Sequence, residues 1–436
     1  MAQLLNNVAG IYPTGDYTCL YDGEGTLEFL GNAIGNVGVP ANGKIIVNIA
    51  PSTGAVRLRI IETNPLNPIR NIRLIMPGYE NTYNTAPFHP NFLASINKFK
   101  VLRFMDWGAT NDSDVSTWDQ RTTPTTYTQA RRDKGAALEY MIDLANANLS
   151  DAWICFPHLA TDDYVRKAAI LVRDRLDPRL RVHFEYSNEV WNGLFAASQY
   201  AQAQGLADGL STDPTRAKLW WYSQRANEVL TICSEVFAEV PNRLVRVIAG
   251  QSSNPWVGEQ VMDWDADAEG LDKSTVADRF DVYAIAPYFG GYLGREPQSD
   301  TTVTMSVTDV LAACDADSIG TNGPEGTTAT NKVNTSTRNI PLVAYEGGQH
   351  LVGVYGAREV QALTNLFIAS NIDPGMQDLY KDDLGRWKER GGSLFVAFSH
   401  ATKYNQYGSW GILQSQSEDP LNVPKYKGLM DYLDTF

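Results

Sequence analysis

Two glutamates stand at the ends of apolar, strand-like runs, where a carboxylate loses solvation energy unless it is paired or used. Glu189 follows the run over 181–186, and Glu346 follows the run over 341–345. Two such carboxylates can flank one glycosidic bond, where one protonates the departing oxygen and the other attacks the sugar carbon. Carboxyl groups about 5–5.5 Å apart retain the configuration of the sugar, and a separation of roughly 6.5–9.5 Å inverts it. The pair predicts glycoside chemistry, provided that the fold brings the two side chains together.

The elements that must position these side chains follow residue 69, where strand-like runs alternate with helical stretches. Eight apolar runs cover 69–77, 101–107, 152–159, 182–186, 244–250, 280–287, 342–345 and 393–398, and helices are expected over 130–147, 162–176, 214–238 and 359–368. Eight strand-then-helix units predict an α/β fold of the (β/α)8 TIM-barrel type, whose reactive groups lie at the carboxyl ends of the strands. A doubly wound open sheet is the alternative, although no GxGxxG follows a strand.

Residues 1–68 have a different pattern, with short β-like runs separated by turn residues such as Asn42-Gly43. This pattern predicts a small all-β module over 1–68, followed by the barrel over 69–436. We expect the module to be a packing partner for the barrel, and a carbohydrate-binding accessory is the alternative. The polar segment 320–339 predicts a long surface loop, with a lid over the substrate as the alternative reading.

A resemblance to a known family rests on the motif YSNEVWN at 186–192 and on the glutamate of AYEGG at 344–348. These segments resemble the glycoside hydrolases of clan A, which are retaining (β/α)8-barrel enzymes. In that family the acid/base glutamate ends strand four and the nucleophile ends strand seven. The resemblance covers 69–436 in outline. It implies that Glu189 is the acid/base, that Asn188 donates to the sugar 2-hydroxyl, and that Glu346 is the nucleophile.

The same resemblance implies roles for three further residues at strand ends. Arg103 would keep Glu346 ionised, since a nearby cation lowers the pKa of a carboxyl. His158 would contact the sugar, and the hydroxyl of Tyr288 would donate to the nucleophile. One departure from the family pattern is Ala286, which stands where some members carry a histidine.

Several tryptophans are candidates for stacking on sugar rings, although a large aromatic side chain is more often part of the packing. They are Trp107, Trp191 and Trp256, which follow predicted strands, and Trp410, which follows the last one. Among the other acidic residues, Asp106 is the strongest competitor for a catalytic role. Glu185 lies within its strand and is expected in a polar layer inside the barrel.

Composition narrows the partners of this 436-residue chain. Its 36 Lys and Arg against 50 Asp and Glu leave a net charge of −14, which disfavours nucleic acid and anionic lipid. No apolar run is long enough to span a bilayer, and the five histidines and four cysteines show no metal-type spacing. The sequence predicts neither a metal site nor a cofactor. The N-terminus lacks the features of a secretory signal, yet a polymer substrate favours an extracellular or particle-associated location.

Together these observations predict a retaining glycoside hydrolase that cleaves neutral β-linked polysaccharides, such as β-glucan, xylan or mannan, within the polymer. One alternative is a non-catalytic carbohydrate-binding or structural protein on the same scaffold. Another is a barrel lyase or isomerase that uses Asp106 or Glu185 as its base.

Overall fold

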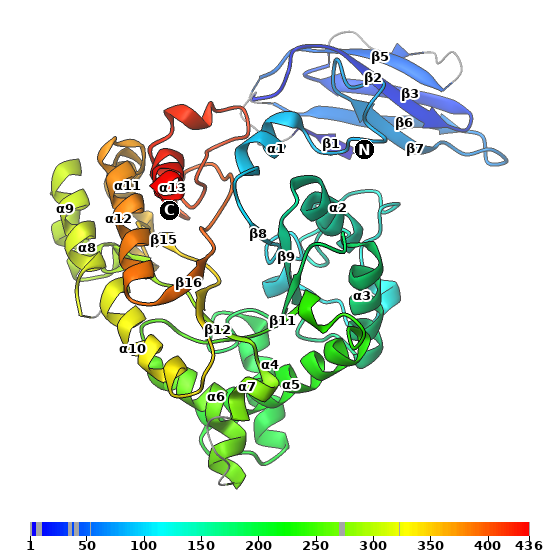
Figure 1. Cartoon of the computed structure of the whole chain (residues 1–436). Coiled ribbons are helices and arrows are strands. Elements are labelled where there is room, and N and C mark those ends of the chain that lie inside the picture. The colour runs from blue at the N-terminus through cyan, green and yellow to red at the C-terminus, as the bar shows by residue number, and fades with distance from the viewer. Residues whose placement is uncertain are drawn as a thin grey trace. The chain divides into compact units, whose positions relative to one another are not determined.

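The computed structural model of the chain describes residues 2–5, 11–33, 37–38, 43–52, 54–269, 275–321 and 323–435. Only the backbone is described for 37–38 and 265–269. The chain forms two compact units (Figure 1). One comprises Met1–Ala94 with Ser415–Ser417, and the other comprises Ser95–Gln414 with Glu418–Phe436.

The smaller unit is built from two antiparallel sheets, with strand orders β1-β6-β3-β4 and β5-β2-β7. The strands are β1 (Ala2–Leu4), β2 (Gly15–Asp22), β3 (Gly25–Gly31), β4 (Val37–Gly38), β5 (Lys44–Ile49), β6 (Val56–Thr63) and β7 (Arg70–Ile75). Apolar side chains alternate along β5, and Ile45, Val47 and Ile49 are buried while their neighbours are exposed. They join buried residues of β2, β3 and β6 in one hydrophobic cluster.

The prediction that 69–77 forms the first strand of the barrel is wrong. Residues Arg70–Ile75 do form a strand, β7, but it pairs antiparallel with β2, with Cys19 opposite Leu74. The apolar run that suggested a barrel strand instead packs Ile72 and Leu74 against the cluster of the smaller unit. The boundary predicted after residue 68 therefore cuts through a sheet, and the compact unit extends to Ala94.

The larger unit contains a curled parallel sheet of seven strands, in the order β16-β14-β12-β11-β10-β9-β8. These strands are β8 (Val101–Arg103), β9 (Asp151–Phe156), β10 (Val182–Tyr186), β11 (Leu244–Ala249), β12 (Val282–Ile285), β14 (Leu342–Ala344) and β16 (Gly392–Phe395). Each of them lies within or overlaps one of the remaining seven predicted runs. The sheet has β8 and β16 as its edges, so the described strands form seven units rather than the eight predicted.

Helices lie outside the curled sheet, as Figure 1 shows for α5, α6, α10 and α12. The helices are α1 (Pro90–Ile96), α2 (Leu138–Asn148), α3 (Asp162–Arg175), α4 (Ala196–Ala207), α5 (Pro214–Val236), α6 (Pro255–Glu269), α7 (Val276–Arg279), α8 (Gln298–Thr302), α9 (Val307–Ser318), α10 (Pro324–Ser336), α11 (Gln361–Ile372), α12 (Gly375–Glu389) and α13 (Pro424–Thr435). The predictions for α3 and α5 are confirmed. The side chain of Asp213 accepts from the amide of Arg216 and caps α5, as expected of an aspartate before proline.

The loop predicted over 320–339 is also wrong, because most of this segment is helix α10. Pro324 stands in its first turn, where the missing N–H costs no hydrogen bond. The helix is polar but partly buried, since its polar side chains find partners. The amide of Asn331 donates to the carbonyl oxygens of Ser252 and Thr327, at 3.0 and 2.8 Å.

The inside of the curled sheet is a layer of buried apolar side chains, among them Trp153, Val247, Ala284, Val343 and Tyr345. Parallel pairing in register places Cys155 of β9 beside Glu185 of β10. A charged residue therefore lies inside this layer. No helix in the described part of the chain is long and apolar enough to cross a membrane.

Candidate active site

Glu189 lies in a turn that begins where β10 ends. Ser187 and Glu189 both have positive φ values, 62° and 43°, which non-glycine residues adopt rarely. The turn is held by backbone hydrogen bonds from Ser187 to the carbonyl of Phe156 at 3.0 Å and from Asn192 to the carbonyl of Glu189 at 2.7 Å. Such strain is sustained only where the surroundings fix the backbone, and it is typical of functional sites.

Glu346 follows β14 and is 6% exposed. The two glycines after it are required by the local geometry. A Cβ atom on Gly347 would lie 2.3 Å from a ring carbon of Phe395, and Gly348 has a φ of 125°. Gly348 belongs to β15 (Gly348–Gln349), which pairs with β13 (Tyr288–Phe289). This pairing brings Tyr288 beside Glu346, and its hydroxyl donates to Oε2 of Glu346 at 2.9 Å.

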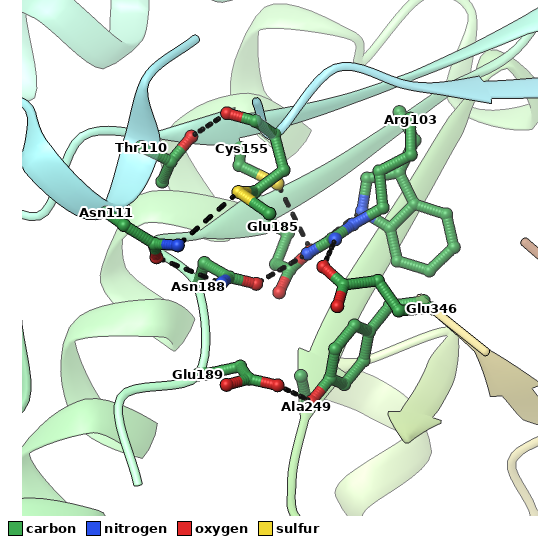
Figure 2. Close-up of polar contacts among 12 residues, drawn as sticks. Arg103, Thr110, Asn111, Cys155, Glu185, Asn188, Glu189, Ala249 and Glu346 are labelled. Carbon is green, nitrogen blue, oxygen red and sulfur yellow. Dashed lines mark hydrogen bonds and ion pairs between the residues drawn. The ribbon is translucent and has the colours of Figure 1, made fainter. Parts of the chain in front are cut away.

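Arg103, at the end of β8, joins the strand ends together (Figure 2). Its Nη1 donates to Oε1 of Glu346 at 2.8 Å. Its Nη2 donates to Oε2 of Glu185 at 2.9 Å and to Oδ1 of Asn188 at 2.8 Å. The guanidinium is 3% exposed and lies over the rings of Tyr345 and Trp153, 4.9 and 5.5 Å from their centroids. Charge-assisted hydrogen bonds of this kind fix both partners in place.

Glu189 has neutral partners instead. The hydroxyl of Tyr345 donates to its Oε1 at 2.9 Å, and the side-chain amide of Asn192 donates to its Oε2 at 2.9 Å. Tyr345 immediately precedes Glu346 in the sequence, so one strand end supports both carboxyl groups. Figure 2 shows Glu189 and Glu346 in the same region, with Arg103 contacting Glu346.

The electrostatics of the two carboxyl groups follow from these contacts. Burial raises the pKa of Glu346, the charge of Arg103 lowers it, and the charge of Glu189 raises it again. Burial also raises the pKa of Glu189, and the hydrogen bonds from Asn192 and Tyr345 oppose this effect. The charge of Glu189 changes the pKa of Glu346, so the two carboxyl groups titrate as a linked pair.

The side chain of Asn188 is held from both sides. Its Oδ1 accepts from Arg103, and its Nδ2 donates to Oδ1 of Asn111 at 3.0 Å. Asn111 belongs to a short 3₁₀ turn, Thr110–Asp112, in the segment after β8. These contacts fix the orientation of the Asn188 amide, with the oxygen toward Arg103.

Trp410 belongs to an aromatic cluster that includes Tyr288, the tyrosine that donates to the predicted nucleophile. Its ring centroid is 5.8 Å from that of Tyr288, 5.0 Å from that of His350 and 5.8 Å from that of Phe398, all in edge-to-face arrangements. The indole N–H donates to the carbonyl of Tyr407 at 2.7 Å. The half-buried Trp410 thus contacts Tyr288, which in turn donates to Glu346.

The structure does not bring the other predicted sugar-binding residues into this network. The His158 ring packs against Tyr200 of α4 at 5.5 Å, and burial lowers the pKa of His158. Trp107 packs against Phe104 at 5.6 Å, the carbonyl of Trp191 accepts from Lys218, and Trp256 lies in the first turn of α6. In the described part of the chain, the side chains of His158, Trp191 and Trp256 form no hydrogen bond or ring contact with Glu189 or Glu346.

Three residues of the network were not predicted from the sequence, namely Tyr345, Asn192 and Asn111. Asn192 stands three residues after Glu189, and Tyr345 stands next to Glu346, so their proximity in sequence was an available signal. Asn111 lies in an irregular segment with no pattern that points to Asn188. Glu185 was expected in a polar interior layer, and it is fully buried against Arg103.

No family of known proteins matches the chain, and no curated protein matches it. Solved structures that resemble the chain at low similarity include a 4-O-α-L-rhamnosyl-β-D-glucuronidase from Fusarium oxysporum, with 16% identity and a TM-score of 0.45 over 82% of this chain and 66% of that chain. An endo-1,4-β-D-mannanase from Thermotoga petrophila has 13% identity and a TM-score of 0.37, over 79% of this chain and 94% of that chain. A β-glucuronidase from Bacteroides uniformis has 10% identity and a TM-score of 0.37, over 91% of this chain and 43% of that chain.

The chain therefore spans less than half of the Bacteroides glucuronidase and about two thirds of the Fusarium enzyme. All three proteins are glycosidases, but similarity of this degree assigns neither an activity nor a substrate to this chain. Its chemistry has to be derived from its own residues.

Proposed function

We propose that the chain is a retaining β-glycoside hydrolase in which Glu346 is the nucleophile and Glu189 is the acid/base. The observation that carries this proposal is the unequal environment of two neighbouring carboxyl groups. Arg103 donates directly to Glu346, whereas the hydrogen-bond donors to Glu189 are the neutral side chains of Tyr345 and Asn192. Pairs of carboxyl groups with environments that differ in this way are suited to separate acid and base roles.

The proton shared by the pair belongs on Glu189. A cation in direct contact stabilises the ionised form of Glu346, and the donated hydroxyl of Tyr288 stabilises it further. Burial favours the neutral form of a carboxyl, and it acts on Glu189 without a hydrogen-bonded cation to offset it. Burial raises the pKa of both carboxyl groups, to about 8 for Glu346, so the pair retains a proton near neutral pH. The direct contact of Arg103 with Glu346 favours placing that proton on Glu189.

In the first step, Oε1 or Oε2 of Glu346 forms a bond to the anomeric carbon while the bond to the leaving oxygen breaks. Glu189 gives its proton to that oxygen, and a glycosyl ester on Glu346 results. In the second step, Glu189 takes a proton from water, the water oxygen attacks the anomeric carbon, and Glu346 leaves as a carboxylate. Retention by this route requires the two carboxyl groups to lie about 5–5.5 Å apart.

The substrate we propose is a neutral β-linked polysaccharide, such as a β-glucan, xylan or mannan, cleaved within the chain. Four of the five N–H groups of Arg103 donate to protein oxygens, so this cation is already engaged with its own carboxylates. A net charge of −14 adds to the disadvantage of an anionic substrate. Trp410 and Tyr288 offer aromatic surface for an uncharged sugar ring. A polymer substrate also favours action outside the cell or on a particle.

The experiment is hydrolysis of aryl β-glycosides and soluble polysaccharides by the wild-type protein and by the variants Glu189→Gln and Glu346→Gln. Loss of the acid/base lowers kcat by about 10²–10⁴-fold, and loss of the nucleophile lowers it at least as much. The matched control is Asp106→Asn, which removes a solvent-exposed carboxylate next to the site and keeps most of the activity.

Three results would contradict the proposal. Binding of glycans without cleavage by the wild-type protein indicates a carbohydrate-binding protein. Unsaturated products, detected by ultraviolet absorbance, indicate a lyase. An Asp106→Asn variant that is as inactive as Glu189→Gln would move the acid/base role to Asp106.

A further inference from the structure

Glu185 is a buried carboxylate that the proposed reaction does not use. It lies in β10, four residues before Glu189, and its side chain is fully buried. Its Oε2 accepts four donors: Nε of Arg103 at 3.3 Å, Nη2 of Arg103 at 2.9 Å, Nε1 of Trp153 at 2.9 Å and Sγ of Cys155 at 3.3 Å. Among the described residues, Oε1 has no hydrogen-bond partner. A buried carboxylate needs such partners, and here they converge on one oxygen.

Arg103 is held between two carboxylates as a consequence. It contacts Glu346 through Nη1 at 2.8 Å and Glu185 through Nη2 at 2.9 Å, and the three side chains are 8% exposed or less. In such an interior, Coulomb interactions are weakly screened. The positive charge of Arg103 is therefore divided between Glu346 and Glu185, and Glu346 receives less stabilisation than an arginine without a second partner would give.

We infer that Glu185 is a positioning residue that orients Arg103 and, by sharing its charge, sets the pH range in which Glu346 and Glu189 react. This inference rests on the proposed function for its kinetic consequence. Its structural basis, the contact of one guanidinium with both Glu185 and Glu346, is independent of that function.

The direction of the effect follows from the groups that face the two carboxyls. Around Glu346 and Glu189 these groups come from the ends of β8, β10 and β14 and from β13: Arg103, Asp106, Glu185, Tyr288 and Tyr345. The charge of Glu185 raises the pKa of Glu189. Its removal should lower the pKa of Glu189, and it should lower the pKa of Glu346 by releasing Arg103 to that carboxylate.

The test is the variant Glu185→Gln, in which an amide of the same shape removes the charge. The carboxyl carbons of ¹³C-labelled glutamate are titrated by NMR, with Glu346 and Glu189 assigned by their glutamine variants. We expect both titration midpoints to fall by about one pH unit. The same shift should appear in kcat/KM, whose acid and basic limbs both move to lower pH. A purely structural role would lower activity at every pH without moving either limb.

Cys155→Ser is the matched control, because it changes the neighbour of the same oxygen without changing charge, and its midpoints should match the wild type. Glu185→Asp keeps a carboxylate and should shift the midpoints less than Glu185→Gln. Unchanged or raised midpoints in a folded Glu185→Gln would overturn the inference. Failure of both Glu185 variants to fold would overturn it too, by showing that the residue serves the fold. If the wild type cleaves no glycoside, the proposed function fails, while the NMR titration still decides the role of Glu185.

Discussion

Glu189 is held in place by the turn that presents it. Its φ of 43° belongs to a region that costs a non-glycine residue of order 1–3 kcal/mol, and Ser187, two residues earlier, has the same unusual sign. Hydrogen bonds from Tyr345 and Asn192 to the carboxyl group help to offset this cost. Glu189 thus combines an unfavourable backbone conformation with a partly buried carboxyl group, an arrangement in which function is gained at the expense of stability.

This residue should make stability depend on pH. Its pKa is raised in the folded protein, so its contribution to stability is complete below the pKa of an unfolded glutamate, about 4.3, and is lost as pH rises through the folded value. Glu189→Gln imitates the protonated form and escapes this loss. We expect the variant to melt about 1–3 °C above the wild type at pH 8 and at the same temperature at pH 4.

Thermal melts followed by circular dichroism over this pH range measure the difference. The surface variant Glu62→Gln is the control and should follow the wild type throughout. Parallel melting curves for Glu189→Gln and the wild type at all pH values would show that the pKa of Glu189 is not raised in the folded protein.

At the scale of elements, α10 shows how polar side chains can hold a helix against the rest of a fold. Beyond its end, Arg338 donates to both carboxylate oxygens of Asp263 on α6, and the two side chains are 3% and 2% exposed. Removing one member of a buried ion pair is strongly destabilising.

We predict that Arg338→Ala lowers the free energy of unfolding by about 3 kcal/mol, measured by urea denaturation. The double variant Arg338→Met with Asp263→Leu should recover most of this loss, because both charges of the pair are replaced by apolar side chains. Arg166→Ala is the control, since the Arg166–Glu235 pair is half exposed and its loss should cost about 1 kcal/mol or less. Equal costs for the two single variants would show that the Asp263 pair is not buried in solution.

The elements also show what hydrophobic periodicity can and cannot decide. The long helices α3 and α5 follow from their caps and from the spacing of their apolar residues. The run over 69–77 is apolar enough for a barrel strand, but strand pairing depends on residues distant in sequence, and β7 pairs with β2. The segment that forms α10 has no apolar face, so hydrophobic periodicity does not reveal it as a helix. Its burial depends instead on hydrogen bonds such as that from Asn331 to Ser252.

For the molecule as a whole, the parallel sheet explains why part of the site could be predicted. Carboxyl ends of parallel strands meet at one edge, so Arg103, Glu189 and Glu346 could be grouped from their positions after apolar runs. Tyr288 was added by resemblance, and its contact with Glu346 is present. The hydrogen bond from Asn188 to Asn111 depends on an irregular segment whose conformation no local sequence pattern predicts.

In the proposed reaction, Glu346 and Glu189 carry out a double displacement at one sugar. Proton NMR of the first-formed hemiacetal during hydrolysis of a β-linked substrate tests it most directly, because the anomer is read before mutarotation mixes the two forms. The β-anomer should appear first, since two inversions at the anomeric carbon restore its configuration. First appearance of the α-anomer would show a single displacement and would contradict a nucleophilic role for Glu346.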